Sequence, residues 1–188
     1  MSRLSEERLN ELYTGTLALV AEHGFDKLTM DQIAEATKSS KATLYRQWGS
    51  KVALFVEALA CTTSVPDELP DTGSLRGDLL EMFGHPEKDV DQSPDLVGAI
   101  LHAMKQNEEL AAAVRQQIID PVNDRISTFI QRGIARGEIA SDCAAIPYIQ
   151  LALMSPFVLL AVLTGSEPDH KFILGYIDGL VLPALGIH

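Results

Sequence analysis

Cysteine and aromatic residues are scarce in this sequence. The 188 residues include two cysteines, Cys61 and Cys143, which are far apart and do not have a metal-ligand spacing. We expect both to be free thiols in a reducing cytosol, buried as small apolar groups. Aromatic residues make up 6% of the chain and hydrophobic residues 46%, with many Ala, Leu and Ile. This balance favours packed helices over sheets.

Sequence signals for secretion and for catalysis are absent as well. Three glutamates within the first eleven residues lie where a signal peptide needs an apolar stretch. The sequence has no nucleophile motif and no glycine-rich phosphate loop. Glu81, His85 and His102 are candidates for a metal or acid–base site, but these three do not share one helix face. We therefore expect no catalytic residue, no metal, no cofactor and a cytoplasmic location.

Charged residues are absent from Cys143 to Ser166, a stretch long enough to cross a membrane. Against a membrane span, Pro147 and Pro156 lie within the stretch and no basic cluster flanks it. A helix that is apolar on nearly all faces is also typical of the buried core of a dimer. We favour this second interpretation and expect no membrane association.

Apolar residues recur at intervals of three and four, and no β-type alternation persists, so the sequence predicts an all-α fold. The spacing of Thr29 and Gln32 is that of a capping box. The first four helices are expected at about 5–23, from Thr29, at about 40–48 and from Ser50. Later helices are expected at 75–83, at 95–106, at 110–136 with an interruption near Pro121, from Asp142 to Leu163, and from Pro168 to about Leu185.

A Pro-, Asp- and Gly-rich stretch between Thr62 and Ser74 interrupts the helical pattern. We place the domain boundary there. The sequence thus predicts an N-terminal domain at 1–62 and a C-terminal helical domain at 74–188.

The net charge of −11 is unevenly distributed. The first 60 residues hold seven basic and eight acidic side chains, whereas the remainder holds eight basic and eighteen acidic side chains. Lys38, Lys41, Arg46 and Lys51 follow one another with no acidic residue between them. Because phosphate contact requires local positive charge, an acidic C-terminal domain does not exclude nucleic acid as a partner.

A motif with fixed spacing lies between Leu28 and Leu54. It comprises Ile33-Ala34, the run Thr43-Leu44-Tyr45-Arg46, the aromatic residue Trp48, and Ser50-Lys51. With this spacing, residues 28–54 resemble the helix-turn-helix motif of the TetR family of transcriptional regulators. The resemblance implies an N-terminal three-helix DNA-binding domain and a C-terminal helical domain for effector binding and dimerisation.

The residue types in the motif suit this role. Ile33, Ala34, Leu44 and Trp48 are apolar where two short helices must pack so that the second can enter a major groove. The residues that we expect to contact DNA are Thr29, Ser40, Lys41, Ala42, Thr43, Tyr45, Gln47 and Lys51. Among them, Ala42 and Gln47 are suited to base edges, and Thr29, Thr43, Tyr45 and Lys51 to phosphates.

Two residues depart from the family pattern. Lys38 occupies the turn where the family usually has glycine, so a left-handed backbone there would carry a Cβ penalty. Ala42 also replaces a frequent glycine. A second interpretation therefore stays open, in which a helical dimer with a degenerate DNA-binding domain acts through protein contacts.

For the C-terminal domain the resemblance implies an effector pocket and a homodimer formed through the last two helices. The pocket candidates are Phe83, Ile100, His102, Met104, Phe129, Met154 and Phe157, a mostly apolar set that would suit a hydrophobic or aromatic ligand. The apolar faces expected at the dimer interface contain Leu151, Val158 and Val162 on one helix and Ile173, Ile177, Leu180 and Val181 on the other. The predicted function is a ligand-responsive repressor that binds double-stranded operator DNA and is released by a small hydrophobic effector.

Overall fold

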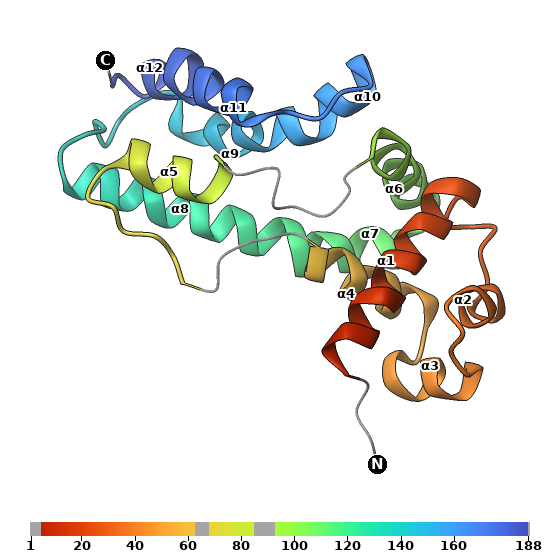
Figure 1. Cartoon of the computed structure of the whole chain (residues 1–188). Coiled ribbons are helices and arrows are strands. Elements are labelled where there is room, and N and C mark those ends of the chain that lie inside the picture. Colours follow the sequence, from red (N-terminus) through yellow and green to blue (C-terminus); the bar gives the residue numbers. More distant parts are fainter. Residues whose placement is uncertain (1–4, 63–67, 85–92, 188) are drawn as a thin grey trace. The chain divides into compact units, whose positions relative to one another are not determined.

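The structure is a computed structural model that describes residues 5–62, 68–84 and 93–187; in these ranges its regular elements are all helices (Figure 1). The predicted all-α fold is confirmed. The N-terminal helices are α1 (Glu6–His23), α2 (Met30–Ala36), α3 (Lys41–Trp48) and α4 (Lys51–Thr62). The middle elements are α5 (Leu75–Phe83), α6 (Pro94–Gln106), α7 (Glu108–Val114), the π-helical segment η2 (Arg115–Ile119) and α8 (Asp120–Ala135). The last are α9 (Ile146–Ser155), π-helical η3 (Pro156–Leu160), α10 (Ala161–Thr164), α11 (His170–Tyr176), π-helical η4 (Ile177–Val181) and α12 (Leu182–Ala184).

The chain divides into two compact units, which are described separately. Unit 1 comprises Met1–Thr63 and Asp91–Ile119, and unit 2 comprises Ser64–Val90 and Asp120–His188. Helix α6 packs against α1, and α7 packs against α4, so both belong with the N-terminal helices. The first junction lies between residues 62 and 74, where the sequence predicts a boundary; the domains 1–62 and 74–188 themselves stay a prediction.

The core of unit 1 forms around α1, whose apolar stripe is buried as its spacing predicts. The oxygen of Ser5 caps α1 by accepting a hydrogen bond from the N–H of Arg8 at 3.3 Å, and Gly24 ends the helix with φ 80°. Ser50 caps α4 in the same way, accepting from the N–H of Ala53 at 3.1 Å. The buried apolar residues of α1 are Leu12, Tyr13, Leu17 and Val20.

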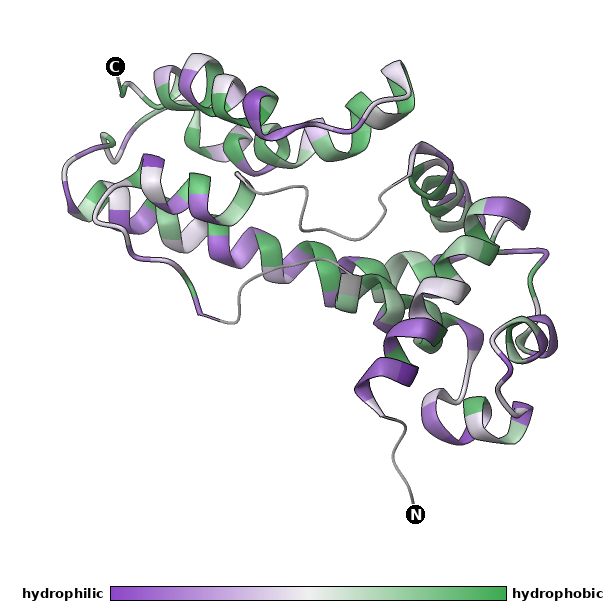
Figure 2. Ribbon diagram, viewed as in Figure 1, coloured by the Kyte–Doolittle hydropathy of each residue, from purple (hydrophilic) through white to green (hydrophobic). Residues whose placement is uncertain are grey.

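The core of unit 2 lies between α5, α8, α9, α11 and η4. Figure 2 shows hydrophobic and hydrophilic residues alternating along α8, as expected of a helix with one buried face. Ile126 and Phe129 of α8 and Leu79 of α5 are fully buried in this core. Burying these side chains supplies the main favourable free energy of folding.

A polar network attaches the segment before α5 to the end of α8. The carboxylate of Asp78 is fully buried, and one oxygen accepts hydrogen bonds from the Thr72 N–H at 2.7 Å and the Thr72 hydroxyl at 2.8 Å. Its other oxygen lies 3.3 Å from Nη2 of Arg136. These partners satisfy a charge whose burial would otherwise be costly.

Two expectations about the C-terminal helices need correction, and a third is confirmed. The predicted cap Asp142 does not start α9, which begins at Ile146 without a side-chain cap. Pro147 lies in its first turn, where a proline is tolerated because its missing N–H would have no partner within the helix. Asp169, one residue beyond Pro168, caps α11 by accepting from the N–H of Phe172 at 2.7 Å. The predicted interruption near Pro121 is present as the π-helical segment η2, which ends two residues before this proline.

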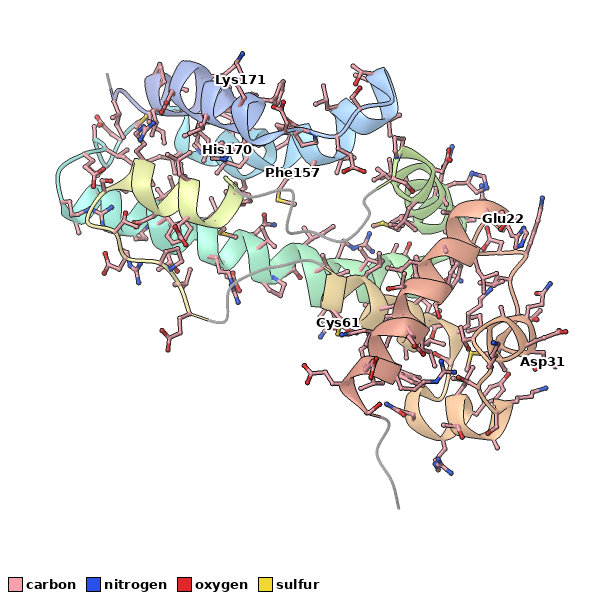
Figure 3. The ribbon with its side chains drawn as sticks, viewed as in Figure 1. Glu22, Asp31, Cys61, Phe157, His170 and Lys171 are labelled. Carbon is pink, nitrogen blue, oxygen red and sulfur yellow. The ribbon has the colours of Figure 1, made fainter. Side chains whose placement is uncertain are left out.

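The two cysteines are free, as predicted, but Cys61 is not buried. It is exposed near the end of α4, three residues beyond Ala58, which is fully buried (Figure 3). Cys143 is half-buried.

Candidate nucleic-acid interface

Side-chain caps define the starts of the two helices of the motif. The hydroxyl oxygen of Thr29 accepts from the N–H of Gln32 at 3.3 Å, and the Gln32 side-chain oxygen accepts from the Thr29 N–H at 2.9 Å. This is the predicted capping box. Ser40 caps α3 by accepting from the N–H of Thr43 at 3.1 Å, and the two hydroxyl oxygens of these residues are 2.8 Å apart. The N-terminus of α3 is thereby fixed.

Apolar side chains hold α2 and α3 against the rest of unit 1. Ile33 and Leu44 are fully buried, and Ala34 and Trp48 are nearly so, which confirms their predicted packing role. The ring of Trp48 meets that of Tyr13 edge to face, with centroids 6.2 Å apart.

Tyr13 also connects α1 to α4 through a polar contact. Its hydroxyl donates to a carboxylate oxygen of Glu57 at 2.5 Å. Burial, followed by the hydrogen bond and charge of Glu57, raises the pKa of Tyr13 well above its ordinary value. Because Tyr13 touches Trp48 as well, it joins α1, α3 and α4.

The outer face of α3 carries the side chains that sequence reasoning assigned to DNA. Lys41, Ala42, Tyr45 and Gln47 are exposed, and Thr43 is half-buried. Tyr45 is 45% exposed although its ring is large and apolar. Arg46 is exposed on the same helix and was not among the predicted contacts, although it belongs to the basic run of the sequence.

Lys41 pairs with an acidic residue of the preceding helix. Its Nζ lies 2.7 Å and 2.8 Å from the two carboxylate oxygens of Asp31, which projects from α2 (Figure 3). The hydrogen bond and charge of Asp31 raise the pKa of Lys41. Both side chains are more than half exposed, so solvent screens the pair and a nearby phosphate can compete for the lysine.

Lys51, at the first position of α4, is engaged within the protein. Its Nζ donates to the carbonyl oxygens of Phe25 and Leu28, both at 2.7 Å, and lies 4.1 Å from the centroid of the Phe25 ring. Burial of the ammonium lowers the pKa of Lys51. The lysine thus closes the loop between α1 and α2, and one of its three N–H donors is left over for another acceptor.

The turn between α2 and α3 has the left-handed residue that the sequence predicts. Lys38 has φ 50°, and among the described residues it is the one non-glycine with a positive φ. Sequence reasoning missed a contact to this turn: the guanidinium of Arg8 in α1 donates to the carbonyl oxygen of Thr37. No local pattern could reveal it, because the two residues are 29 positions apart.

The predicted effector-pocket residues fall into two groups. Phe129 is fully buried in unit 2, and Phe83, Met154 and Phe157 pack around that core; the Phe83 and Phe157 rings have centroids 5.9 Å apart. The remaining candidates belong to unit 1: Ile100 and Met104 are half-buried, and His102 is exposed. Among the described residues, no group of three or more His, Cys, Asp or Glu side chains could hold a metal ion.

The residues predicted at the dimer face differ in exposure: Leu151, Val162 and Leu180 are exposed, and Val158 is half-buried. Ile173, Ile177 and Val181 are buried in the core of their own protomer, so placing them at the surface was wrong. Both sides of this helix are apolar, and spacing alone does not tell which side faces inward. The exposed large apolar residues of these helices are Tyr148, Leu151, Leu159, Val162, Leu163, Phe172 and Leu180.

The helix from Ile146 to Thr164 is long and apolar enough to cross a membrane, with a mean hydropathy of 2.0. A single such helix is weak evidence for a membrane protein, because apolar helices of soluble proteins pass the same test. Only 18% of its most apolar window is buried within the described part of the chain. Its apolar surface is therefore open to a partner.

Both parts of the sequence match known families. Residues 12–58 match the family of bacterial regulatory proteins called tetR, and residues 69–180 match the tetracyclin repressor-like C-terminal domain. An uncharacterised helix-turn-helix transcriptional regulator of Mycobacterium tuberculosis is 33% identical over 183 residues, covering 95% of this chain and 88% of that protein. The DNA-binding transcriptional repressor TetR of Mycobacteroides abscessus is 33% identical over 181 residues, covering 94% of this chain and 93% of that protein.

Solved structures share the same architecture. A transcriptional regulator from Pseudomonas aeruginosa PAO1 superimposes with a TM-score of 0.69 at 20% identity, covering 95% of this chain and 92% of that one. This similarity supports the fold, and the sequence matches confirm the resemblance seen in residues 28–54. The chain belongs to the TetR family of helix-turn-helix transcriptional regulators.

Proposed function

We propose that this chain is a ligand-responsive transcriptional repressor that binds operator DNA as a homodimer and is released by a small hydrophobic effector. The exposed polar face of α3, backed by the buried side chains of Leu44 and Trp48, carries the proposal. A helix that is held from behind while its polar residues reach solvent is suited to entering a major groove. The relatives that are named transcriptional regulators support the same role.

The residues of α3 divide into base-reading and phosphate-binding groups in this proposal. Ala42 is small enough for close approach to a thymine methyl, and the Gln47 amide suits a base edge. The phosphate-binding group lies at the starts of α2, α3 and α4. It comprises Ser40, Lys41, Thr43 and Tyr45 in and before the N-terminal half of α3, Thr29 before α2, and the remaining donor of Lys51. We add Arg46 to this group, because it is exposed on α3.

The dimer is proposed to form through the last helices, α9 to α12. Tyr148, Leu151 and Leu163 are 70%, 75% and 76% exposed, and Leu180 of η4 is 51% exposed. Apolar surface of this extent favours a protein partner. A second copy is the partner that DNA recognition requires, because two recognition helices must reach two half-sites about one helical turn apart.

The effector is proposed to bind in unit 2, beside Phe83, Met154 and Phe157. These side chains are half-buried and apolar, so they suit a hydrophobic or aromatic molecule. Ile100, His102 and Met104 stay weaker candidates, because they belong to unit 1. An effector would act by favouring a dimer geometry whose recognition helices no longer match the operator.

Selection of binding sequences from random duplex DNA tests the proposal, because the selection itself defines the operator. The enriched duplexes should contain two related half-sites, and their affinity should fall steeply as salt rises. Gln47→Ala should relax selectivity at particular positions, whereas Tyr45→Phe should weaken binding to all sequences. Lys41→Ala should also weaken binding to all sequences; Lys105→Ala, which removes an exposed lysine of α6, is its charge-matched control and should not. Failure to enrich any sequence, with the protein folded, would contradict the proposal.

Native mass spectrometry of the purified protein tests the effector. A co-purified molecule, or one found in a panel of aromatic and aliphatic compounds, should bind the dimer and lower its affinity for the selected duplex. Phe157→Asp should abolish this binding without changing DNA affinity. A ligand that binds equally well to this variant would place the site elsewhere.

A further inference from the structure

The turn that joins α2 to α3 adopts a backbone conformation that its own sequence disfavours. Lys38 has φ 50°, where a side chain with a Cβ clashes with its own backbone and glycine would not. The turn nevertheless closes with two backbone hydrogen bonds, from Ser39 N–H to Ala34 oxygen at 2.8 Å and from Lys38 N–H to Glu35 oxygen at 3.1 Å. The left-handed φ angle still carries a cost relative to glycine, which a contact from another element would offset.

Arg8 of α1 supplies such a contact. Its Nη2 donates to the carbonyl oxygen of Thr37 and lies 3.2 Å from the Ser39 hydroxyl, so one guanidinium nitrogen binds the turn on both sides of Lys38. Its Nη1 donates to a carboxylate oxygen of Glu11 at 2.6 Å, one turn further along α1. The planar guanidinium lets one nitrogen bind the turn while the other binds Glu11.

A second contact between α1 and the turn lies on the same face of α1 as Arg8. Gly15 follows Arg8 by seven residues, which is two helical turns. A Cβ at Gly15 would lie only 3.2 Å from the side-chain methyl of Thr37. The Thr37 hydroxyl in turn donates to the Ile33 carbonyl oxygen at 2.6 Å. Helix α1 therefore runs close to the Thr37 methyl at Gly15 and binds the Thr37 carbonyl oxygen through Arg8.

We propose that Arg8 is a positioning residue for the recognition helix. From α1 it holds the backbone at Thr37–Ser39 in the left-handed turn that Lys38 disfavours. Helix α3 begins at Lys41, directly after its cap Ser40, so the backbone angles of the turn determine the direction of α3. This inference rests on the proposed DNA-binding role of α3.

The pairing of Arg8 with Glu11 offers a simpler explanation, in which Arg8 only forms a surface ion pair within α1. Such i,i+3 pairs contribute little to stability and would not affect the turn. Glu11→Gln separates the two explanations, since it removes the ion pair and leaves the contacts to Thr37 and Ser39 in place.

Hydrogen exchange in the free protein tests the contact with the turn. In Arg8→Met, which keeps the aliphatic stem and loses the donors, the Ser39 amide should exchange about tenfold faster. Lys38→Gly in the same chain should reverse most of this increase, because glycine adopts the left-handed conformation without the contact. Glu11→Gln should leave Ser39 exchange unchanged. Unchanged exchange in Arg8→Met, or an equal increase in Glu11→Gln, would overturn the inference. If Arg8→Met unfolds, Arg8→Ala, which also removes every donor, takes its place.

DNA binding to a duplex selected with the unmodified protein tests the positioning role. Arg8→Met should weaken this binding about tenfold, and the double variant with Lys38→Gly should recover most of the loss. The positioning role would be overturned if Lys38→Gly changed DNA affinity equally in the unmodified protein and in Arg8→Met. It would also be overturned if Arg8→Met exchanged its Ser39 amide faster but bound DNA with unchanged affinity. If the unmodified protein selects no duplex, the proposed function fails instead, and the exchange data still decide whether Arg8 holds the turn.

Discussion

Lys51 illustrates how one side chain can serve both the fold and the proposed DNA contact. Its ammonium donates to the carbonyl oxygens of Phe25 and Leu28, and the remaining donor is proposed to reach a phosphate. Lys51→Met should lower the free energy of unfolding by about 2–3 kcal/mol, because two hydrogen bonds from a charged group are lost and partial exposure of Lys51 weakens each of them. It should also reduce the slope of log affinity against log salt by about 0.9, the value of one phosphate contact.

Thermal melts and DNA titrations over a salt series measure the two effects separately. Lys171→Met, an exposed lysine of α11, is the control and should change neither. A loss of stability with an unchanged salt slope would restrict Lys51 to its structural role.

Tyr13 predicts a specific pH dependence of stability. Burial and Glu57 raise the pKa of Tyr13 in the folded protein, whereas in the unfolded chain it is about 10. The folded state therefore keeps a proton that the unfolded chain releases in alkali. This contribution to stability is complete below pH ~10 and is lost as the pH rises toward the folded-state pKa.

Urea unfolding from about pH 8 to pH 11 checks this dependence. Tyr13→Phe should lower stability by about 1–2 kcal/mol near neutral pH, because Glu57 loses its donor. Its stability should then fall less steeply in alkali than that of the unmodified protein. Parallel stability curves for the two proteins would show that the Tyr13 proton is not involved.

At the level of helices, the features that the sequence predicted correctly are local ones. The capping roles of Ser5, Thr29 and Ser50 depend on residues three positions away, so they could be read from the order of residues. Contacts between distant segments could not be predicted in this way, and the hydrogen bond from Arg8 to the Thr37 carbonyl oxygen is an example. The burial of Ile173 was equally unreadable, because a helix with two apolar sides gives no signal for which side faces the core.

The candidate DNA-binding site could be predicted from the sequence to a similar extent. The exposed positions of Tyr45 and Gln47 follow from the helical spacing of the buried Leu44 and Trp48. The internal hydrogen bonds of Lys51 depend on how the loop between α1 and α2 folds back, which spacing does not specify.

The N-cap of α3 gives a prediction for a whole element. Ser40→Ala removes the acceptor for the Thr43 N–H and should cost about 1 kcal/mol of stability. Ser93 caps α6 in the same way, accepting from the Leu96 N–H at 3.3 Å, so Ser93→Ala is a matched control. Both variants should lose similar stability in thermal melts, whereas only Ser40→Ala should weaken binding to the selected duplex. Equal DNA affinity of the two variants would argue against α3 as the recognition helix.

For the whole molecule, the distribution of charge and apolar surface supports one assembly. The chain carries a net charge of −11, most of it in the C-terminal part, which keeps that part away from phosphates. The same part has no charged residue from Cys143 to Ser166. An uncharged apolar face on an otherwise acidic surface favours association through that face, which suits the proposed closed dimer.

Two glycines, one in α11 and one in η4, provide a test of the proposed dimer that leaves the fold of the protomer unchanged. Gly175 and Gly179 are exposed, and a Cβ at either would meet no atom within 4 Å. Small residues four apart allow the backbones of two helices to approach closely, which suits the proposed interface on this side of α11 and η4. Gly175→Leu should leave the helical circular dichroism unchanged and convert the dimer into a monomer in analytical ultracentrifugation. Gly98→Leu in α6, where a Cβ also meets no atom within 4 Å, should stay dimeric. A dimer that persists in Gly175→Leu would move the interface to the exposed face of α9 and α10, where Leu151→Asp should then disrupt it.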